Sequence, residues 1–147
     1  MSKIGLILSH LFVREGEEYK FDMVDYVIKH HRNMNQDWCI VLAGHGPSTP
    51  PTAIREQVDH LIWNPIFQEN EVGTGHPKLC VESLQYLNES GIHSTLKLRA
   101  LDYIKDEQVL PSLHSLGKKA LVSEQTSLSL NKIGDLFIFG DTQFLGL

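Results

Sequence analysis

The sequence has few of the features that mark several large classes of protein. It contains only two cysteines, Cys39 and Cys80, which do not suggest a disulfide framework. Its longest apolar runs, near residues 4–8 and 39–43, are far shorter than the roughly 20 residues that span a bilayer. Residues 1–3 lack the basic, apolar and small-residue regions of a secretory signal. We therefore expect no membrane span and a reducing, cytoplasmic location.

Positive charge is also scarce. Thirteen Lys and Arg residues against eighteen Asp and Glu residues give a formal net charge of −5, and no basic run is present. A general nucleic-acid binder needs a basic patch, so we expect no nucleic-acid partner. Hydrophobic residues make up 41% of the 147 residues, which is too many for a disordered chain. The length fits a single domain over residues 1–147.

Apolar patterns along the chain alternate between those of strands and those of helices. Strands are expected at residues 4–8, 39–43, 60–63, 94–99, 118–122 and 136–139, and helices at 19–33, 53–58, 77–90 and 107–116. This order predicts an α/β three-layer sandwich on a largely parallel sheet. Ligands bind such sheets at the carboxyl ends of the strands, so the polar residues after each strand are the candidates for function.

The strand at residues 94–99 and the residues after it form the strongest candidate for chemistry. Lys97 and Arg99 are expected on one polar face of this strand, and Asp102 follows its end. Two cations can hold phosphate oxygens while the carboxylate binds Mg²⁺ or Mn²⁺, an arrangement that suits a nucleotide diphosphate. The alternative is an exposed strand edge with a surface ion pair.

Residues 73–78, Gly-Thr-Gly-His-Pro-Lys, form a second candidate ahead of a helix. Glycines such as Gly75 let backbone N–H groups approach an anion, and the helix start up to Lys78 adds partial positive charge. The spacing matches neither a Walker loop nor a full dinucleotide fingerprint. A plain helix-entry loop is the alternative.

Two carboxylates, Asp135 and Asp141, flank the last apolar strand. Either can act as a base or as a second metal ligand if its end of the strand reaches the site. In the alternative interpretation, Phe137 and Phe139 belong to the core and the two aspartates form turns.

Polar residues follow the first two strands as well. The first strand is expected to break at Ser9 and His10, and His45 follows the second strand. His10, His45 and Asp102 are candidate ligands of a hydrolytic metal, although no H-x-H or H-E-x-x-H spacing supports this. Ser9 is not in a G-x-S-x-G motif, so serine hydrolase chemistry is not expected.

Residues 73–141 together resemble the glycosyltransferases with a nucleotide-sugar-binding GT-A fold, in particular the WavE-like lipopolysaccharide-synthesis group. The likeness lies in a helix, a Lys-x-Arg strand at Lys97 and Arg99 with an acidic residue soon after, and an aspartate before an aromatic strand ending in Phe139-Gly140. Residues 3–9 are similar to the first strand of these proteins.

The resemblance implies a small glycosyltransferase that uses a nucleotide-diphosphate sugar. Asp102 would belong to the motif that binds Mn²⁺ or Mg²⁺ and the diphosphate, and Lys97 and Arg99 would hold the donor. Ser9 and His10 would meet the base or ribose. Asp135 would lie near the reacting sugar, and either Asp135 or Asp141 would act as general base if the reaction inverts.

This sequence departs from the family pattern at two points. Leu101 stands where the family usually has a further carboxylate, and only residues 141–147 follow Gly140, where GT-A enzymes carry an acceptor site. Acceptor binding is then expected from a neighbouring subunit in a homo-oligomer, or the protein is a minimal transferase acting on a glycan or lipopolysaccharide acceptor. A non-catalytic nucleotide-binding module of the same fold and a metal-dependent hydrolase stay open as alternatives.

Overall fold

The computed structural model describes residues 3–11, 19–65, 75–105, 107–114, 121–122 and 137–142. Strands and helices alternate through these residues in the order expected from the sequence. The elements are β1 (Ile4–Leu11), α1 (Lys20–Arg32), β2 (Trp38–His45), α2 (Thr52–Arg55), β3 (His60–Asn64), α3 (Gly75–Glu89), β4 (Ser94–Arg99), α4 (Val109–His114), β5 (Leu121–Val122) and β6 (Phe137–Asp141). The predicted α/β class is confirmed. None of the described helices has both the length and the apolar character needed to cross a membrane.

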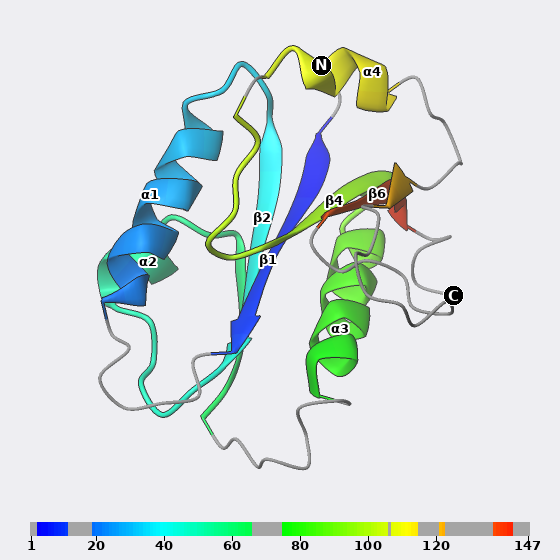
Figure 1. The fold of residues 1–147 in the computed structure, drawn as a ribbon. Helices are drawn as coiled ribbons and strands as arrows, with labels where there is room; N and C mark the ends of the chain where they lie inside the picture. Colours follow the sequence, from blue (N-terminus) through cyan, green and yellow to red (C-terminus); the bar gives the residue numbers. More distant parts are fainter. Residues whose placement is uncertain are drawn as a thin grey trace, which may run out of the picture.

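The described strands form one sheet in the order β3-β2-β1-β4-β6-β5 (Figure 1). β3, β2, β1 and β4 are parallel, whereas β6 is antiparallel to both β4 and β5. The order differs from the doubly wound order 3-2-1-4-5-6 only because the reversed strand β6 lies between β4 and β5. We call the edge at which the four parallel strands end the carboxyl edge, and the opposite one the amino edge.

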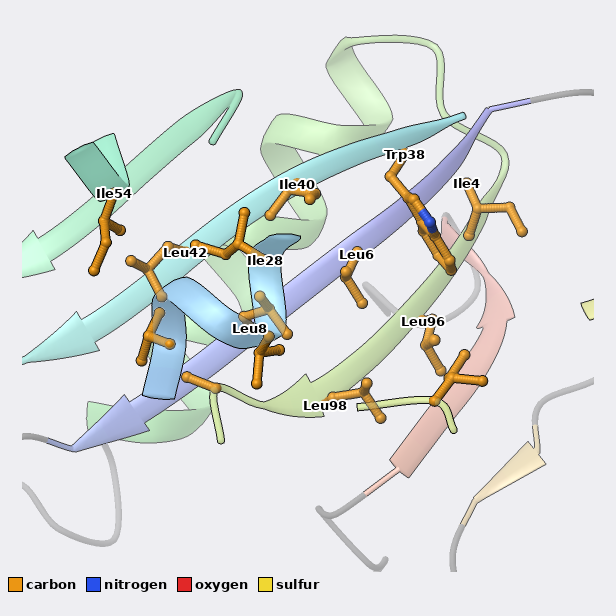
Figure 2. Close-up of a cluster of buried hydrophobic side chains, with 14 of the residues drawn as sticks. Ile4, Leu6, Leu8, Ile28, Trp38, Ile40, Leu42, Ile54, Leu96 and Leu98 are labelled. Atoms are coloured by element: carbon orange, nitrogen blue, oxygen red, sulfur yellow. The ribbon is translucent and has the colours of Figure 1, made fainter. Parts of the chain in front are cut away.

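Helices cover both faces of the sheet. On one face, Ile28 of α1 and Ile54 of α2 pack with Leu6 and Leu42 in a large apolar cluster that also includes Leu110 of α4 (Figure 2). On the other face, the side chains of α3 pack on the sheet in a second cluster. That cluster contains Ile7, Val41, Leu84 and Leu87. The arrangement is compatible with the three-layer sandwich expected from the sequence.

The apolar spacing of residues 19–33 predicts that α1 buries Met23, Val24, Val27, Ile28 and His31, and the structure differs from this prediction at two positions. Val24, Val27 and Ile28 are buried at helical spacing, as predicted. Met23, which we expected to point inward, is exposed, and Phe21 is buried instead. Phe21 lies three residues before Val24 on the same helical face, whereas Met23 lies to one side of this stripe.

Two strands run further than their apolar patterns indicate. β1 does not break at Ser9 and His10, because His10 pairs with Gly44 and Leu11 with His45 in the ladder to β2. β2 accordingly includes His45 as its last residue. Regular backbone hydrogen bonds to a neighbouring strand therefore outweigh the polar character of these side chains.

Gly5 allows α3 to pack closely against β1. A Cβ atom at this position would lie 2.8 Å from Cδ1 of Leu87 and 3.1 Å from Oγ1 of Thr95. Both neighbours are buried, so neither has free space to move into. The missing side chain thus sets the distance between the helix and the sheet.

α3 ends in a left-handed glycine, as the sequence predicts. Gly91 has a φ of +77°. The N–H of Ile92 donates to the carbonyl oxygen of Leu87 at 3.0 Å, and the N–H of Gly91 donates to that of Asn88 at 3.1 Å. These are the two hydrogen bonds of a Schellman motif, and Ile92 and Leu87 belong to the same apolar cluster.

Replacement of Gly91 tests the left-handed stop of α3. Gly91→Ala is expected to lower the free energy of unfolding by about 1 kcal/mol, because alanine is strained at positive φ. Gly91→Asn is expected to cost less, since asparagine tolerates this conformation. No atom lies within 4 Å of the added Cβ, so packing does not contribute. Urea unfolding measures both variants, and equal stability of the alanine variant and the unaltered protein would contradict the assignment.

Candidate functional site

The carboxyl edge brings together several of the residues singled out in the sequence. β2 ends there at His45, β3 at Asn64 and β4 at Arg99. α3 starts at the same edge with Gly75 (Figure 1). The direction in which successive strands are added changes between β1 and β4, and parallel sheets bind ligands at such a switch point. This edge is therefore the candidate site.

The ladder between β1 and β4 ends at the switch point. Ser9 pairs with Arg99, and the N–H of Ala100 donates to the carbonyl oxygen of Ser9 at 2.9 Å. The ladder between β1 and β2 continues for two more residues, His10 and Leu11. The chain after β4 thus leaves β1 at this point. Ser9 itself is fully buried, so its side chain does not reach the surface.

Arg99 and Asp102 form the polar end of β4. The Nε–H of Arg99 donates to Oδ2 of Asp102 at 3.2 Å, and the N–H of Asp102 donates to the carbonyl oxygen of Arg99 at 3.0 Å. Their side chains are 50% and 41% exposed. Exposed ion pairs of this kind contribute at most about 1 kcal/mol. Either group can therefore exchange its partner for a charged ligand at small cost.

Lys97 does not lie in the open beside Arg99, as we expected from the alternation of β4. Its side chain is only 2% exposed. β4 lies between β1 and β6 and is covered on both faces, so the face that carries Lys97 is buried rather than polar and open. Burial raises the pKa of Cys80 on α3, and the charge of Lys97 opposes this increase. Lys97 also pairs with Ile7 of β1, which belongs to the apolar cluster under α3, so Lys97 lies on the face of the sheet that α3 covers.

A cavity of about 220 Å³ opens at the ends of β2 and β3, next to the first turns of α3. All of its lining residues belong to these three elements: His45, Ile62, Trp63, Asn64, Lys78, Leu79 and Glu82. The indole N–H of Trp63 donates to the carbonyl oxygen of Gly46 at 3.3 Å, which holds the ring in place. The lining combines an imidazole, an amide and charges of both signs, as small-molecule sites commonly do.

The start of α3 adds positive potential to the same cavity. Gly75 is the first residue of the helix rather than part of a loop ahead of it, and Lys78 lies in the first turn. The first N–H groups of a helix have no partner within the helix, and the helix dipole makes this end partially positive. Lys78 is exposed and lines the cavity, so this edge of the cavity favours an anion.

Asp135 and Asp141 flank β6 in the sequence, and only Asp141 can be placed relative to the carboxyl edge. Asp141 pairs with Ser94, at the amino edge, because β6 runs opposite to β4. The structure therefore does not bring Asp141 together with Asp102. Asp135 lies outside the described residues. Phe137, two residues later, pairs with Leu98 near the carboxyl edge.

Metal binding by this edge would depend on Asp102. No group of three or more His, Cys, Asp or Glu side chains that could hold a metal occurs in the described part of the chain. That part includes the side chains of His45 and Asp102 but not that of His10, so the hydrolytic cluster stays a prediction. One carboxylate together with phosphate oxygens is a donor set that Mg²⁺ accepts. Asp102 thus fits a metal that arrives with a diphosphate.

Trp63, Asn64 and Glu82 were missed in the sequence. Asn64 ends β3, and its position directly after an apolar run was a usable signal. The apolar spacing of residues 77–90 predicts that Glu82 lies on the solvent face of α3, whereas it lines the cavity. Its position one turn after Lys78 gave no indication of this, because the direction of the face depends on how the helix lies against β3.

Comparison with known proteins gives no family for this chain. No protein-family model matches the sequence, and no curated protein matches it. Function must therefore be inferred from the geometry of the carboxyl edge.

The chain that follows Asp102 is held by a buried histidine of α1. The Nδ1–H of His31 donates to the carbonyl oxygen of Val27 at 2.8 Å, and Nε2 accepts the N–H of Ile104 at 3.4 Å. Burial lowers the pKa of His31 from 6.5 to about 4. A neutral ring is required, because a proton on Nε2 would face the N–H of Ile104.

The pH dependence of stability tests the neutral state of His31. The folded-state pKa lies below the ordinary value, so the contribution of His31 is complete above pH 6.5 and decreases as the pH falls toward 4. The loss amounts to about 3 kcal/mol, at 1.36 kcal/mol for each pKa unit. Urea unfolding between pH 7 and 4 measures it. His31→Gln lacks the titrating ring and should show a shallower slope, and equal slopes would contradict the assignment.

Proposed function

We propose that the protein binds a nucleotide-diphosphate sugar at the carboxyl edge and transfers its sugar to a glycan-type acceptor. The observation that carries the proposal is the position of Arg99 and Asp102. Arg99 ends β4 and Asp102 follows it at the switch point, on the same edge as the start of α3 and the cavity beside it. Cationic, carboxylate and backbone N–H groups at one edge provide what a diphosphate with a metal needs.

The diphosphate would be bound by Arg99, Lys78 and the first N–H groups of α3. Arg99 and Lys78 are both exposed, and neither needs to be desolvated before it meets a phosphate oxygen. The guanidinium of Arg99 can hold two phosphate oxygens at once, whereas Lys78 acts as a point charge. Because the chain has a net charge of −5, such a local group of cations is needed to attract an anionic donor.

The nucleoside end of the donor fits the cavity beside α3. Asn64 offers a base or ribose both a hydrogen-bond donor and an acceptor, whereas the ring of Trp63 packs with Phe21 of α1 at 6.1 Å between ring centroids. A volume of about 220 Å³ is enough for part of a nucleoside rather than for a whole nucleotide sugar. The sugar would then lie outside the cavity, on the side of β4 and Asp102.

Mn²⁺ or Mg²⁺ would be held by Asp102. When bound, such a metal neutralises the charge that develops on the leaving diphosphate. Arg99 would release Asp102 for this task and bind phosphate oxygens itself, since the two groups share only an exposed ion pair.

In the transfer itself, the oxygen of an acceptor hydroxyl attacks the anomeric carbon of the sugar. The bond from that carbon to the diphosphate oxygen breaks, and its electron pair stays on the diphosphate. Asp135 is our candidate for the base that takes the hydroxyl proton, if the reaction inverts. Asp141 is left out of this role, because its backbone position is at the amino edge.

The sheet and one residue bear on the choice between a transferase and a non-catalytic module. A largely parallel sheet with helices on both faces is compatible with the GT-A expectation. Leu101, in contrast, packs against the large apolar cluster, so this position cannot supply a second carboxylate without a loss of packing. A nucleotide-binding module without transfer activity is therefore the second candidate.

Replacement of Asp102 tests the metal-dependent part of the proposal. Asp102→Asn is expected to weaken binding of UDP, GDP, CDP or ADP in the presence of Mn²⁺ by about tenfold or more, because the charged ligand of the metal is lost. Isothermal titration measures the affinities. Asp22→Asn changes an exposed aspartate of α1 and should have no effect. Unchanged affinity in Asp102→Asn would remove this residue from the site. A separate assay with nucleotide sugars distinguishes the two candidate functions, because only a transferase releases nucleoside diphosphate.

Replacement of Lys78 tests the cavity. Lys78→Ala is expected to weaken binding of the same nucleoside diphosphates by about tenfold, because one charge-assisted contact is lost. The fluorescence of Trp63, which lines the cavity, is used to follow binding. As a control, Trp63→Phe keeps only the buried Trp38, whose fluorescence should not change when a nucleoside diphosphate binds. Lys29→Ala removes an exposed lysine of α1 that pairs with Asp25 and serves as the matched control. Equal affinities of the two lysine variants would exclude Lys78 from the site.

A further inference from the structure

After Asp102 at the carboxyl edge, the chain turns back along α1. From Ala100 it passes in front of the sheet toward α4 at the other end of the molecule (Figure 1). Near that end, the backbone N–H of Asn35 donates to Oε2 of Glu107 at 2.9 Å. The segment with Asp102 is thus a strap, residues 100–104, that lies over α1.

Two adjacent histidines of α1 bind both backbone groups of one residue in this strap. The Nε2–H of His30 donates to the carbonyl oxygen of Ile104 at 2.7 Å, and Nε2 of His31 accepts the N–H of Ile104 at 3.4 Å. Adjacent residues of a helix point about 100° apart, so two such side chains meet one residue only when the strap lies in the groove between them. The rings carry opposite tautomers, which follows from the partners of each nitrogen.

Aromatic contacts hold the residue between Asp102 and Ile104. The ring of Tyr103 lies 4.6 Å from that of His30 and 5.7 Å from that of Tyr26, measured between ring centroids. Tyr26 and His30 are one turn apart on α1. Tyr103 is therefore packed against the helix although part of its side chain is exposed.

Asp102 thus lies between two fixed points of the backbone. Ala100 is bound to Ser9 of β1, and Ile104 is bound to α1. Both residues are buried, whereas Asp102 between them is accessible. A span of three residues between fixed ends leaves its backbone few conformations. We propose that His30 and His31 are positioning residues that hold Asp102 in place to receive the metal and diphosphate of the donor, an inference that rests on the proposed function.

Two replacements of His30 separate positioning from a general structural role. His30→Phe keeps an aromatic ring against Tyr103 but removes the hydrogen bond to Ile104, whereas His30→Gln keeps a donor near the same place. His60→Phe is the control, because His60 stacks on Tyr86 at 4.0 Å and lies on β3. The experiment uses the full chain. NMR measures the hydrogen exchange rate of the Ile104 amide, and titration in the presence of Mn²⁺ measures the affinity for each of the four nucleoside diphosphates.

His30→Phe is expected to speed exchange of the Ile104 amide and to weaken nucleoside diphosphate binding, each by about fivefold, the effect of one lost hydrogen bond. His30→Gln should restore most of both, and His60→Phe should change neither. In an Asp102→Asn background, His30→Phe should cause no further loss of affinity, because it acts through Asp102.

Three results would overturn the inference. Unchanged Ile104 exchange in His30→Phe would show that the strap does not need this hydrogen bond. Unchanged binding in His30→Phe, while Asp102→Asn weakens it, would refute the positioning role and leave the proposed function intact. If His30→Phe weakens nucleoside diphosphate binding equally in the unaltered protein and in the Asp102→Asn background, it does not act through Asp102 and its effect is a general structural one. If the unaltered protein binds none of the nucleoside diphosphates, the proposed function fails. Faster exchange of the Ile104 amide in His30→Phe would then show only that His30 stabilises the strap.

Discussion

The parallel pairing of β1 on both of its sides is the constraint on which the rest of the structure depends. β1 pairs with β2 along its whole length and with β4 from Ile4 to Ser9. A strand held in this way is buried on both faces, which explains its uninterrupted apolar run. Gly5 lets α3 close over one face, and the unequal lengths of the two ladders make the chain leave β4 beside Ser9. The candidate site therefore exists because β1 is central.

The sequence was informative where local chemistry determines the structure. The bounds of β4 were predicted in full, since Gly91 ends α3 and the alternation of the strand begins soon after. The order of elements followed from apolar periodicity, and most of the buried stripe of α1 was correct. The importance of the ends of the strands followed from the expected parallel sheet. Arg99 and Asp102 were singled out in this way, and Lys78 from the glycines ahead of its helix; all three lie at the carboxyl edge.

The remaining features depend on contacts between distant parts of the chain, which local sequence patterns do not reveal. Alternation in β4 shows which residues share a face but not whether that face is covered, so Lys97 was assigned to an open face that lies under α3. The direction of β6 cannot be read from its residues, and it decides at which edge Asp141 lies. His30 and Ile104 are 74 residues apart, so their contact has no signal in the sequence.

Lys97 is buried, but its position still bears on the candidate site. It shares a face of β4 with Arg99, two residues away, and its charge acts on Cys80 across the layer between the sheet and α3. Electrostatic interactions decay less in such an interior than in water, so a buried cation contributes to the potential at the nearby edge. In the proposed function, Arg99 and Lys78 would bind the diphosphate directly, and Lys97 would favour its binding through this potential. The proposed donor would therefore meet a local group of cations, Arg99, Lys78 and Lys97, although the chain has a net charge of −5.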